Sequence, residues 1–424
     1  STLLASSAAS DVYKRQLYNS VPMFQQVGSS AYKEGLENTL ALDEHFGHPH
    51  RNFHSIHVGG TNGKGSCSHT LAAILQEAGY RVGLYTSPHL VDFRERIRIN
   101  GQPIPEEYVV RFVEKERDFF GPLHPSFFEL TTAMAFRYFA DEHVDVAVIE
   151  VGLGGRLDCT NIVHPDLCII TNISFDHTQF LGNTLEKIAG EKAGIIKSGI
   201  PVIIGETTPE TKPVFAKKAR EVGAPILFAE EDEKDDYPGL ECELKGLYQT
   251  KNTRTLLTAI PELRKAGYNL SEQAVRSGFA HVCELTGLMG RWQKLQDAPT
   301  LICDTGHNVG GITYITEQLK QQSYRKLHMI IGMVNDKDIH GVLALLPQEA
   351  EYYFTKASVR RALPECELAQ LASEAGLQGI CYPDVPSAVR AAQEKSLPED
   401  FIFVGGSSFI VADLLANRDA LNLH

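Results

Sequence analysis

The segment HVGGTNGKGSCSH, residues 57–69, contains four glycines and one lysine. The apolar run HSIHV at 54–58 leads into it and is typical of a buried strand, while CSHTLAAILQEAGY at 67–80 has the periodicity of a helix. A glycine-rich loop between a strand and a helix directs backbone N–H groups and the positive end of the helix dipole at an anion. We therefore predict a phosphate-binding loop here.

The loop departs from the common sequence pattern G-x-x-x-x-G-K-[ST], in which a residue with a hydroxyl group follows the lysine directly. Gly65 stands between Lys64 and Ser66. In a phosphate loop, Lys64 would meet the β- and γ-phosphates and the Ser66 hydroxyl would bind Mg²⁺. The alternative is a turn in which Ser66 only caps the helix, but the lysine and the preceding strand favour the phosphate loop. The candidate nucleotide-binding residues are Gly60, Thr61, Asn62, Gly63, Lys64, Gly65 and Ser66.

The composition limits the classes of function. The chain has 424 residues, of which 43% are hydrophobic and 22% are charged, and its formal net charge is -13. A chain of this length suits two or three domains. The negative charge argues against a broad surface for nucleic acid or anionic membranes, which would need clustered lysine and arginine. Since no apolar run approaches the ~20 residues that span a bilayer, we expect a soluble globular protein.

The cysteines and the first residues bear on the cellular compartment. Eight cysteines are scattered without C-x-x-C pairs, so we expect neither structural zinc nor a disulfide framework. We therefore expect the cysteines to be reduced thiols and the protein to be cytoplasmic. Residues 1–16, STLLASSAASDVYKRQ, lack the basic start and apolar stretch of a signal peptide, and we expect them to be a non-native or disordered lead.

Short apolar runs alternate with helical patterns along the chain, which indicates parallel sheets buried on both faces. The expected strands are 53–60, 81–87, 144–152, 167–174, 200–206, 224–230, 300–306, 327–334, 351–357, 379–383 and 401–408. A helical segment is expected over 250–288, an exposed acidic loop or hairpin over 229–242, and a linker near 290–297. We predict two α/β domains, a parallel-sheet ATP-binding domain at 17–292 and a smaller Rossmann-like domain at 296–424.

Charged residues follow two of the expected strands. Glu150 ends the run VDVAVIE, and Asp176 and His177 follow the run LCIITNIS. Open parallel sheets hold their ligands at the carboxyl ends of strands, which is where a carboxylate can bind Mg²⁺. The alternatives are a solvated surface glutamate and a histidine that is satisfied on the surface or in the core. The glycines that follow Glu150 in VGLGGRLDCTN permit a tight turn. The presence of Arg156, Asp158 and Asn161 in the same motif favours a site.

Two further groups allow two interpretations. Arg94, Arg96 and Arg98 in FRERIRINGQPI would share one face of an extended segment, either as a solvated face or to bind an anionic substrate. Glu129 in FFELTTAMAF is either a charge at a helix start or a carboxylate of the site. The residues leave both interpretations of the arginines open, and for Glu129 we favour the functional interpretation.

The spelling GTNGKGS resembles the phosphate loop of the Mur-ligase superfamily and, within it, of folylpolyglutamate synthases and their bifunctional dihydrofolate synthase relatives. The resemblance continues in order through TSPHL (86–90), VIEVGLGGRLDCTN (148–161), FDHT (175–178), EKAGIIK (191–197), GRWQ (290–293), DTGHNVGG (304–311) and IGMVNDKD (331–338). It implies a Mur-ligase-type ATPase domain followed by a glutamate-ligase domain.

The resemblance also implies roles for single residues. The implied metal ligands are Ser66, Ser87, Glu150 and His177. The implied catalytic residues are Lys64, His177, Lys192 and Arg291, and further nucleotide contacts are implied for Asn252, Arg291, Asp304 and His307. Lys192 aligns with the lysine that Mur-type enzymes carbamylate, which would give a carboxylate-like group for a second Mg²⁺. The alternative is an ordinary helix lysine paired with an acid. Orienting or capping roles are open to Asp336, Lys337 and Asp338.

The activity implied by the resemblance is ATP-dependent addition of L-glutamate to the carboxylate of folate, with dihydropteroate as a second candidate acceptor, through an acyl phosphate. The expected cofactors are ATP, two Mg²⁺ ions and a monovalent cation such as K⁺. We expect a cytoplasmic monomer that acts on small molecules, without nucleic-acid or membrane partners. A Mur-type cell-wall ligase is the first alternative, and Gly65 disfavours it. A nucleotide-gated switch protein is the second, and the motifs on successive strands argue against it.

Overall fold

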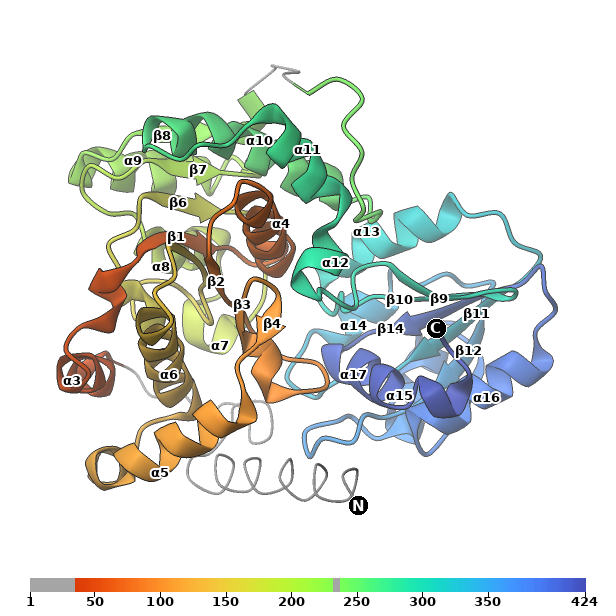
Figure 1. Ribbon diagram of the computed structural model, residues 1–424. Coiled ribbons are helices and arrows are strands. Elements are labelled where there is room, and N and C mark those ends of the chain that lie inside the picture. Colours follow the sequence, from red (N-terminus) through yellow and green to blue (C-terminus); the bar gives the residue numbers. More distant parts are fainter. Residues whose placement is uncertain (1–34, 232–236) are drawn as a thin grey trace. The chain divides into compact units, whose positions relative to one another are not determined.

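The structure is a computed structural model that describes residues 35–231 and 237–424 (Figure 1). The chain forms two compact units. The first takes in the described parts of Ser1–Ile173, Thr184–Glu243 and Lys251–Gly287, and the second takes in Ser174–Asn183, Leu244–Thr250 and Leu288–His424. The expected lead, residues 1–16, and part of the expected acidic loop, residues 232–236, lie outside the described residues.

The first unit is built on a sheet of eight strands in the order β4-β3-β2-β5-β1-β6-β7-β8. The strands are β1 (His54–Gly59), β2 (Val82–Tyr85), β3 (Ile97–Ile99), β4 (Gln102–Pro103), β5 (Val146–Glu150), β6 (Leu167–Ile170), β7 (Val202–Ile204) and β8 (Ile226–Phe228). The pairs from β2 to β8 are parallel, whereas β3 and β4 add antiparallel edge pairs. The parallel strands confirm the expected fold class.

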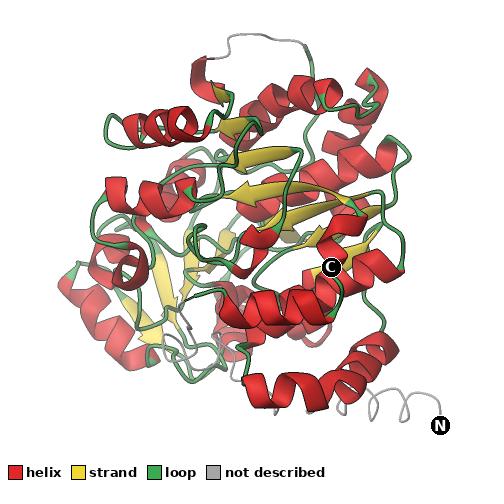
Figure 2. Cartoon of the chain, turned by 90° about the vertical axis from the view of Figure 1, so that its left-hand side faces the viewer, coloured by secondary structure: helices red, strands yellow, loops and turns green. Residues whose placement is uncertain are grey.

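Helices cover both faces of this sheet because its central strands are apolar on both sides (Figure 2). On β5, Ala147 and Ile149 face α3 (Glu37–His45), α5 (Glu106–Leu123) and α6 (Phe127–Asp141). Val146 and Val148 face α4 (Lys64–Glu77), α10 (Gln249–Lys265) and α11 (Glu272–Ala280). Each fully buried valine or isoleucine side chain of this kind stabilises the fold by about 1.5–3 kcal/mol. The other helices are α7 (Thr178–Leu181), which belongs to the second unit, and α8 (Leu185–Ala193), α9 (Lys212–Val222) and α12 (Val282–Thr286).

The second unit has a six-stranded sheet in the order β13-β12-β11-β14-β10-β9. The strands are β9 (Gln293–Asp297), β10 (Thr300–Cys303), β11 (Leu327–Ile331), β12 (Glu351–Phe354), β13 (Gly379–Cys381) and β14 (Phe401–Gly405). Its helices are α13 (Val309–Lys320), α14 (Ile339–Leu343), α15 (Glu365–Glu374), α16 (Val385–Lys395) and α17 (Ser408–Ala416). All neighbouring strands are parallel except β9, which runs antiparallel to β10.

Some segments differ from their expected form. The region 290–297, expected as a linker, contains β9, whose alternating exposed side chains make it an edge strand. Arg94 and Arg96 lie in a 3-10 helix, Phe93–Arg96, and only Arg98 lies in β3. The expected common strand face of the three arginines was therefore wrong. Across the described part of the chain, no helix has the length and apolarity needed to cross a bilayer.

Candidate functional site

The glycine-rich loop of the first unit lies between β1 and α4, as the sequence predicted. Gly60 has a φ of +138° and Gly63 a φ of +85°, values that favour glycine. A Cβ atom on Gly60 would lie 1.9 Å from Oγ1 of Thr171, and one on Gly63 would lie 2.4 Å from Oδ1 of Asn252. Both glycines are therefore required by conformation and by close neighbours, and the loop forms a cradle that a side chain would fill.

Residues after β6 hold this loop in place. The Thr61 N–H donates to the carbonyl oxygen of Asn172, and the Asn62 N–H donates to Oδ1 of Asn172, both at 2.9 Å. Oγ1 of Thr171 donates to the carbonyl oxygen of Asn62 at 2.5 Å. We did not predict these contacts, although the TN pair follows a strand that we expected. The side chain of Lys64 also stays at the loop, since its Nζ donates to the Thr61 carbonyl oxygen at 3.0 Å.

Lys192 contacts the phosphate loop from another element. It lies in the last turn of α8, which begins where the hydroxyl of Thr184 accepts the N–H of Lys187. Nζ of Lys192 donates to the carbonyl oxygen of Gly60 at 2.8 Å, and the side chain is buried. The structure therefore brings Lys192 to the phosphate loop, where it contacts a backbone carbonyl oxygen, whereas the alternative raised from the sequence was pairing with an acidic side chain.

Glu150 ends β5 and lies beside the start of α4. Its Oε2 accepts the N–H of Ser87 at 2.9 Å. Glu150 is in register with Val58 of β1, the strand that leads through the glycine-rich loop into α4. Burial raises the pKa of the Cys67 thiol in the first turn of α4, and the charge of Glu150 raises it further. Ser66 belongs to that turn and is 1% exposed. Ser66, Ser87 and Glu150, three of the predicted metal ligands, therefore come together at one edge of the sheet.

The oxygen atoms at this edge suit Mg²⁺ in kind. Within residues 35–231 and 237–424, no group of three or more His, Cys, Asp or Glu side chains is arranged to hold a metal ion. Mg²⁺ usually takes one or two carboxylates from the protein and completes its shell with water and substrate phosphates. The carboxylate of Glu150 and the hydroxyl of Ser66 at the start of a helix match that pattern.

A second group of predicted residues gathers in the second unit, around Asp304 after β10. The Asp304 carboxylate accepts the Tyr248 hydroxyl and the Trp292 N–H on Oδ2, both at 2.7 Å, and the Gly306 N–H on Oδ1 at 2.8 Å. Burial raises the pKa of Asp304, while these donors and the charge of Arg291 act in the opposite direction. The carboxylate therefore fixes the turn that carries Arg291.

Arg291 and His307 contact the same short segment. Nη1 of Arg291 donates to the Thr305 hydroxyl, and also to the carbonyl oxygen of Gly290 at 3.2 Å. Nδ1 of His307 lies 2.9 Å from the carbonyl oxygen of Thr305. The structure thus brings Arg291, Asp304 and His307 together, as the sequence predicted.

Asp176 and His177 belong to the second unit rather than the first. Nζ of Lys337 lies 2.5 Å from Oδ1 of Asp176, while Nε2 of His307 and Nδ2 of Asn308 lie 3.5 and 3.3 Å from Oδ2. Burial by itself would raise the pKa of Asp176, but the hydrogen bond from His307 and the charges of His177, His307 and Lys337 hold it well below its usual range. Sequence reasoning missed this cluster because its members come from distant motifs.

Glu129 has a local role that the sequence left open. Its Oε2 accepts the N–H of Ser126 at 2.5 Å, and the Ser126 hydroxyl accepts the N–H of Glu129 at 3.2 Å. This reciprocal pair is a capping box at the start of α6. The helix-start interpretation accounts for the buried carboxylate, so the functional interpretation that we favoured has no support from this contact.

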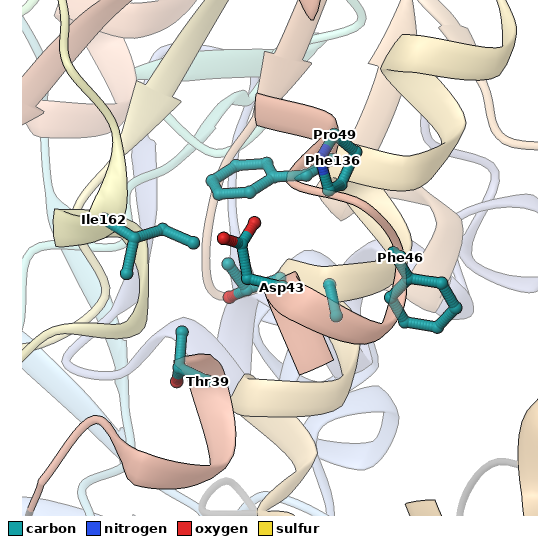
Figure 3. Close-up of a pocket in the computed structure, with 8 residues that line it drawn as sticks. Thr39, Asp43, Phe46, Pro49, Phe136 and Ile162 are labelled. Carbon is teal, nitrogen blue, oxygen red and sulfur yellow. The ribbon is translucent and has the colours of Figure 1, made fainter. Parts of the chain in front are cut away.

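A small pocket in the first unit lies apart from the predicted residues. It is lined by Thr39, Asp43, Phe46, Pro49, Thr132, Ala133, Phe136 and Ile162 (Figure 3). The Asp43 carboxylate accepts hydrogen bonds from Nδ1 of His48 at 2.6 Å and from Nδ1 of His50 at 2.7 Å. These contacts fix the orientation of the carboxylate. The lining contains none of the residues predicted for nucleotide, metal or catalysis.

Comparison with known proteins agrees with this arrangement. The Mur ligase middle domain matches residues 58–256, and the Mur ligase glutamate ligase domain matches residues 290–408. A dihydrofolate synthase/folylpolyglutamate synthase of Bacillus subtilis is 32% identical over 416 residues, which cover 90% of this chain and 94% of the relative. The protein of the same name from Escherichia coli is 37% identical over 378 residues and 86% of each chain.

Solved structures give the same result. Escherichia coli FolC in complex with DHPP and ADP superposes with a TM-score of 0.85 at 33% identity and covers 98% of each chain. The bifunctional folylpolyglutamate synthase/dihydrofolate synthase of Yersinia pestis, complexed with AMPPNP and Mn ion, has a TM-score of 0.81 at 34% identity and covers 93% of this chain and 95% of that one. The chain therefore belongs to the folylpolyglutamate synthase/dihydrofolate synthase family of the Mur ligases.

Proposed function

We propose that this chain is an ATP-dependent ligase that adds L-glutamate to the carboxylate of folate, with dihydropteroate as a second acceptor. The observation that carries the proposal is the arrangement at the glycine-rich loop: Lys64 and the buried Lys192 both contact it, Ser66 begins the helix that follows, and Glu150 ends the neighbouring strand. The relatives carry the name dihydrofolate synthase/folylpolyglutamate synthase, and this favours a folate acceptor over the acceptor of a cell-wall ligase.

The chemistry explains why such a loop is needed. Joining a carboxylate to an amine is unfavourable in water until a carboxylate oxygen becomes a good leaving group, and phosphorylation by ATP achieves this. Phosphoryl transfer is catalysed mainly by positioning and by cations around the phosphate oxygens. Lys64 supplies one such charge at the start of α4, where the helix dipole adds to it. Lys192 holds the Gly60 carbonyl and so fixes the loop.

Ser66 and Glu150 would hold Mg²⁺, which would supply positive charge at the phosphates. Ser87 orients Glu150 through its backbone N–H. Solved relatives contain ADP, or AMPPNP with Mn ion, which supports the use of ATP and a divalent metal here. The contributions of His177, Arg291, Asp304 and His307, a second Mg²⁺ and K⁺ stay predictions from the family resemblance.

Carbamylation of Lys192 is part of the proposal. The ammonium donates one N–H to Gly60, and a carbamate nitrogen retains one N–H, so the modification keeps the observed contact. In ¹³C-bicarbonate buffer, ¹³C NMR of the folded protein would show a carbamate carbon signal that Lys192→Met lacks. A monomer in the cytoplasm is also proposed, and analytical ultracentrifugation checks the oligomeric state.

One assay tests the function. ADP formation with L-glutamate is compared for dihydropteroate, tetrahydrofolate and a UDP-linked muropeptide as acceptors, and the products are identified by mass. Glutamate-dependent turnover with a pteridine acceptor is the expected result. Turnover with the muropeptide alone would overturn the proposal, and ATP hydrolysis independent of every acceptor would favour a switch protein.

A further inference from the structure

Two cysteines of the second unit lie together at the carboxyl end of its sheet. Cys366 is the second residue of α15, and Cys381 is the last residue of β13. The chain passes from β12 through α15 to β13, and β12 and β13 are parallel neighbours. Cys381 is in register with Phe354, the last residue of β12. Lys356, two residues after Phe354, lies 3.1 Å from the carboxylate of Glu365, the neighbour of Cys366 in sequence. The start of the helix and the end of the strand therefore meet at one edge.

The pair is also the most accessible thiol group of the chain. All eight cysteines lie in described residues, and all are free thiols. Cys366 alone is exposed and Cys381 is partly buried, whereas Cys67, Cys159 and Cys168 are buried. An oxidant in solution would therefore meet Cys366 first and would find a second thiol beside it.

We propose that Cys366 and Cys381 form a site of reversible oxidation, at which a low-molecular-weight disulfide converts the two thiols into one intramolecular disulfide. This inference is independent of the ligase activity.

The reaction takes two exchange steps. The Cys366 thiol loses its proton and its sulfur attacks one sulfur of the small disulfide RSSR, which releases RS⁻ and leaves a mixed disulfide on Cys366. The Cys381 sulfur, after losing its proton, then attacks Sγ of Cys366 and expels the second RS⁻. The two released thiolates take up the two protons. The protein sulfurs are oxidised, RSSR is reduced to two RSH, and a dithiol reductant reverses both steps.

The surroundings set the order of these steps. Burial raises the pKa of Cys381 to about 11, and the neighbouring Cys366 and Glu365 side chains add to the effect. Cys381 therefore keeps its proton at neutral pH. Cys366 is the exposed thiol of the pair, so it is the attacking residue and the partly buried Cys381 is the resolving residue.

The disulfide would constrain a loop at the ligand-binding edge of the sheet. The loop 355–364 joins β12 to α15, and the disulfide would fasten its far end to β13. Arg361 in this loop pairs with Asp336 at 2.6 Å, and the next residue, Lys337, holds Asp176. Oxidation would thus restrict a segment that contacts the cluster around Asp176.

The test uses the full chain, reduced and then incubated with oxidised glutathione. Intact mass and peptide mapping should show the loss of two hydrogen atoms and a crosslink between residues 366 and 381, which dithiothreitol reverses. C381S should accumulate a glutathione adduct on Cys366 instead. C366S should react about tenfold more slowly, because the accessible thiol is gone. C283S is the matched control and should oxidise like the wild type.

Two readouts separate this site from incidental oxidation. Trypsin should cleave after the exposed Arg360 more slowly in the oxidised wild type than in the reduced wild type, with no such change in C381S. A stable glutathione adduct on wild-type Cys366 at the level found in C381S would overturn the proposal. A crosslink to a different cysteine, or a disulfide that dithiothreitol does not reduce, would also overturn it.

Discussion

Nζ of Lys192 donates a hydrogen bond to the carbonyl oxygen of Gly60 at 2.8 Å, which ties the end of α8 to the phosphate loop. Lys192 is 5% exposed, so its charged end lies in the interior of the first unit. A buried carbonyl that loses its donor costs about 1–3 kcal/mol. The lysine is therefore a structural support of the loop in addition to any chemical role.

We expect Lys192→Met to lower the free energy of unfolding by about 1–3 kcal/mol and to weaken ATP binding, because the Gly60 carbonyl would lose its partner. Urea unfolding and calorimetric titration with ATP measure the two effects. Lys187→Met on the exposed side of the same helix is the control and should leave both unchanged. Wild-type ATP affinity in Lys192→Met would contradict the support of the loop.

Gly63 gives a sharper test, because Gly79 offers a matched control at the other end of α4. Both have positive φ, +85° and +90°, so alanine at either position incurs about 1–2 kcal/mol of backbone strain. A Cβ on Gly63 would also collide with Asn252, whereas nothing lies within 4 Å of a Cβ on Gly79. We expect Gly63→Ala to abolish detectable ATP binding and Gly79→Ala to retain it. Equal ATP affinities of the two variants would contradict the assigned role of the loop.

The parallel strands and the phosphate loop could be predicted because their signals are local. A strand such as β5 is apolar on both faces, and the phosphate loop has a characteristic sequence pattern between a strand and a helix. The capping box of Ser126 and Glu129 could also be predicted from the sequence, because a serine followed three residues later by a glutamate is typical of this motif. Our preference for a functional Glu129 overlooked that signal.

The rest depended on contacts between distant residues. Asp176 meets Lys337 across 161 positions of sequence, and no local pattern gives that pairing. Strand β9 reads QKLQD, which is too polar to predict a strand, and it forms because it needs to bury only one face at the sheet edge. The assignment of residues 174–183 to the second unit has the same cause, because tertiary contacts decide it.

Glu150→Ala should reduce kcat/KM by about 150-fold, which corresponds to about 3 kcal/mol of transition-state stabilisation, as expected for a key electrostatic group. Glutamate-dependent phosphate release over a range of Mg²⁺ concentrations measures the effect, and excess Mg²⁺ should restore part of the activity. Lys64→Ala should lose a similar factor, with no rescue by Mg²⁺. Glu142→Ala is the control, since Glu142 forms an exposed pair with Arg81 on the surface. Near-normal turnover of Glu150→Ala would contradict the site.

The stability of the second unit should depend on pH through Glu351, whose carboxylate lies 2.5 Å from Nζ of Lys326 and 2.7 Å from Nζ of Lys395. Burial acts to raise the pKa of Glu351, but the hydrogen bonds and charges of the two lysines lower it to about 2. A depressed carboxyl pKa stabilises the fold above the unfolded value of about 4.3, and this contribution is lost as the pH falls toward the folded value.

Wild type should therefore exceed Glu351→Gln in the free energy of unfolding at pH 7, by about 1 kcal/mol or less because the pairs are partly exposed. The difference should shrink steadily between pH 5 and pH 3 and should also decrease in high salt, as urea unfolding at each pH would show. Glu394→Gln, at an exposed position beside Lys395 on α16, is the control and should show a smaller difference at every pH. A gap between wild type and Glu351→Gln that stays constant or widens in acid would show that the ion pairs do not stabilise the unit, because protonation of Glu351 must remove their attraction.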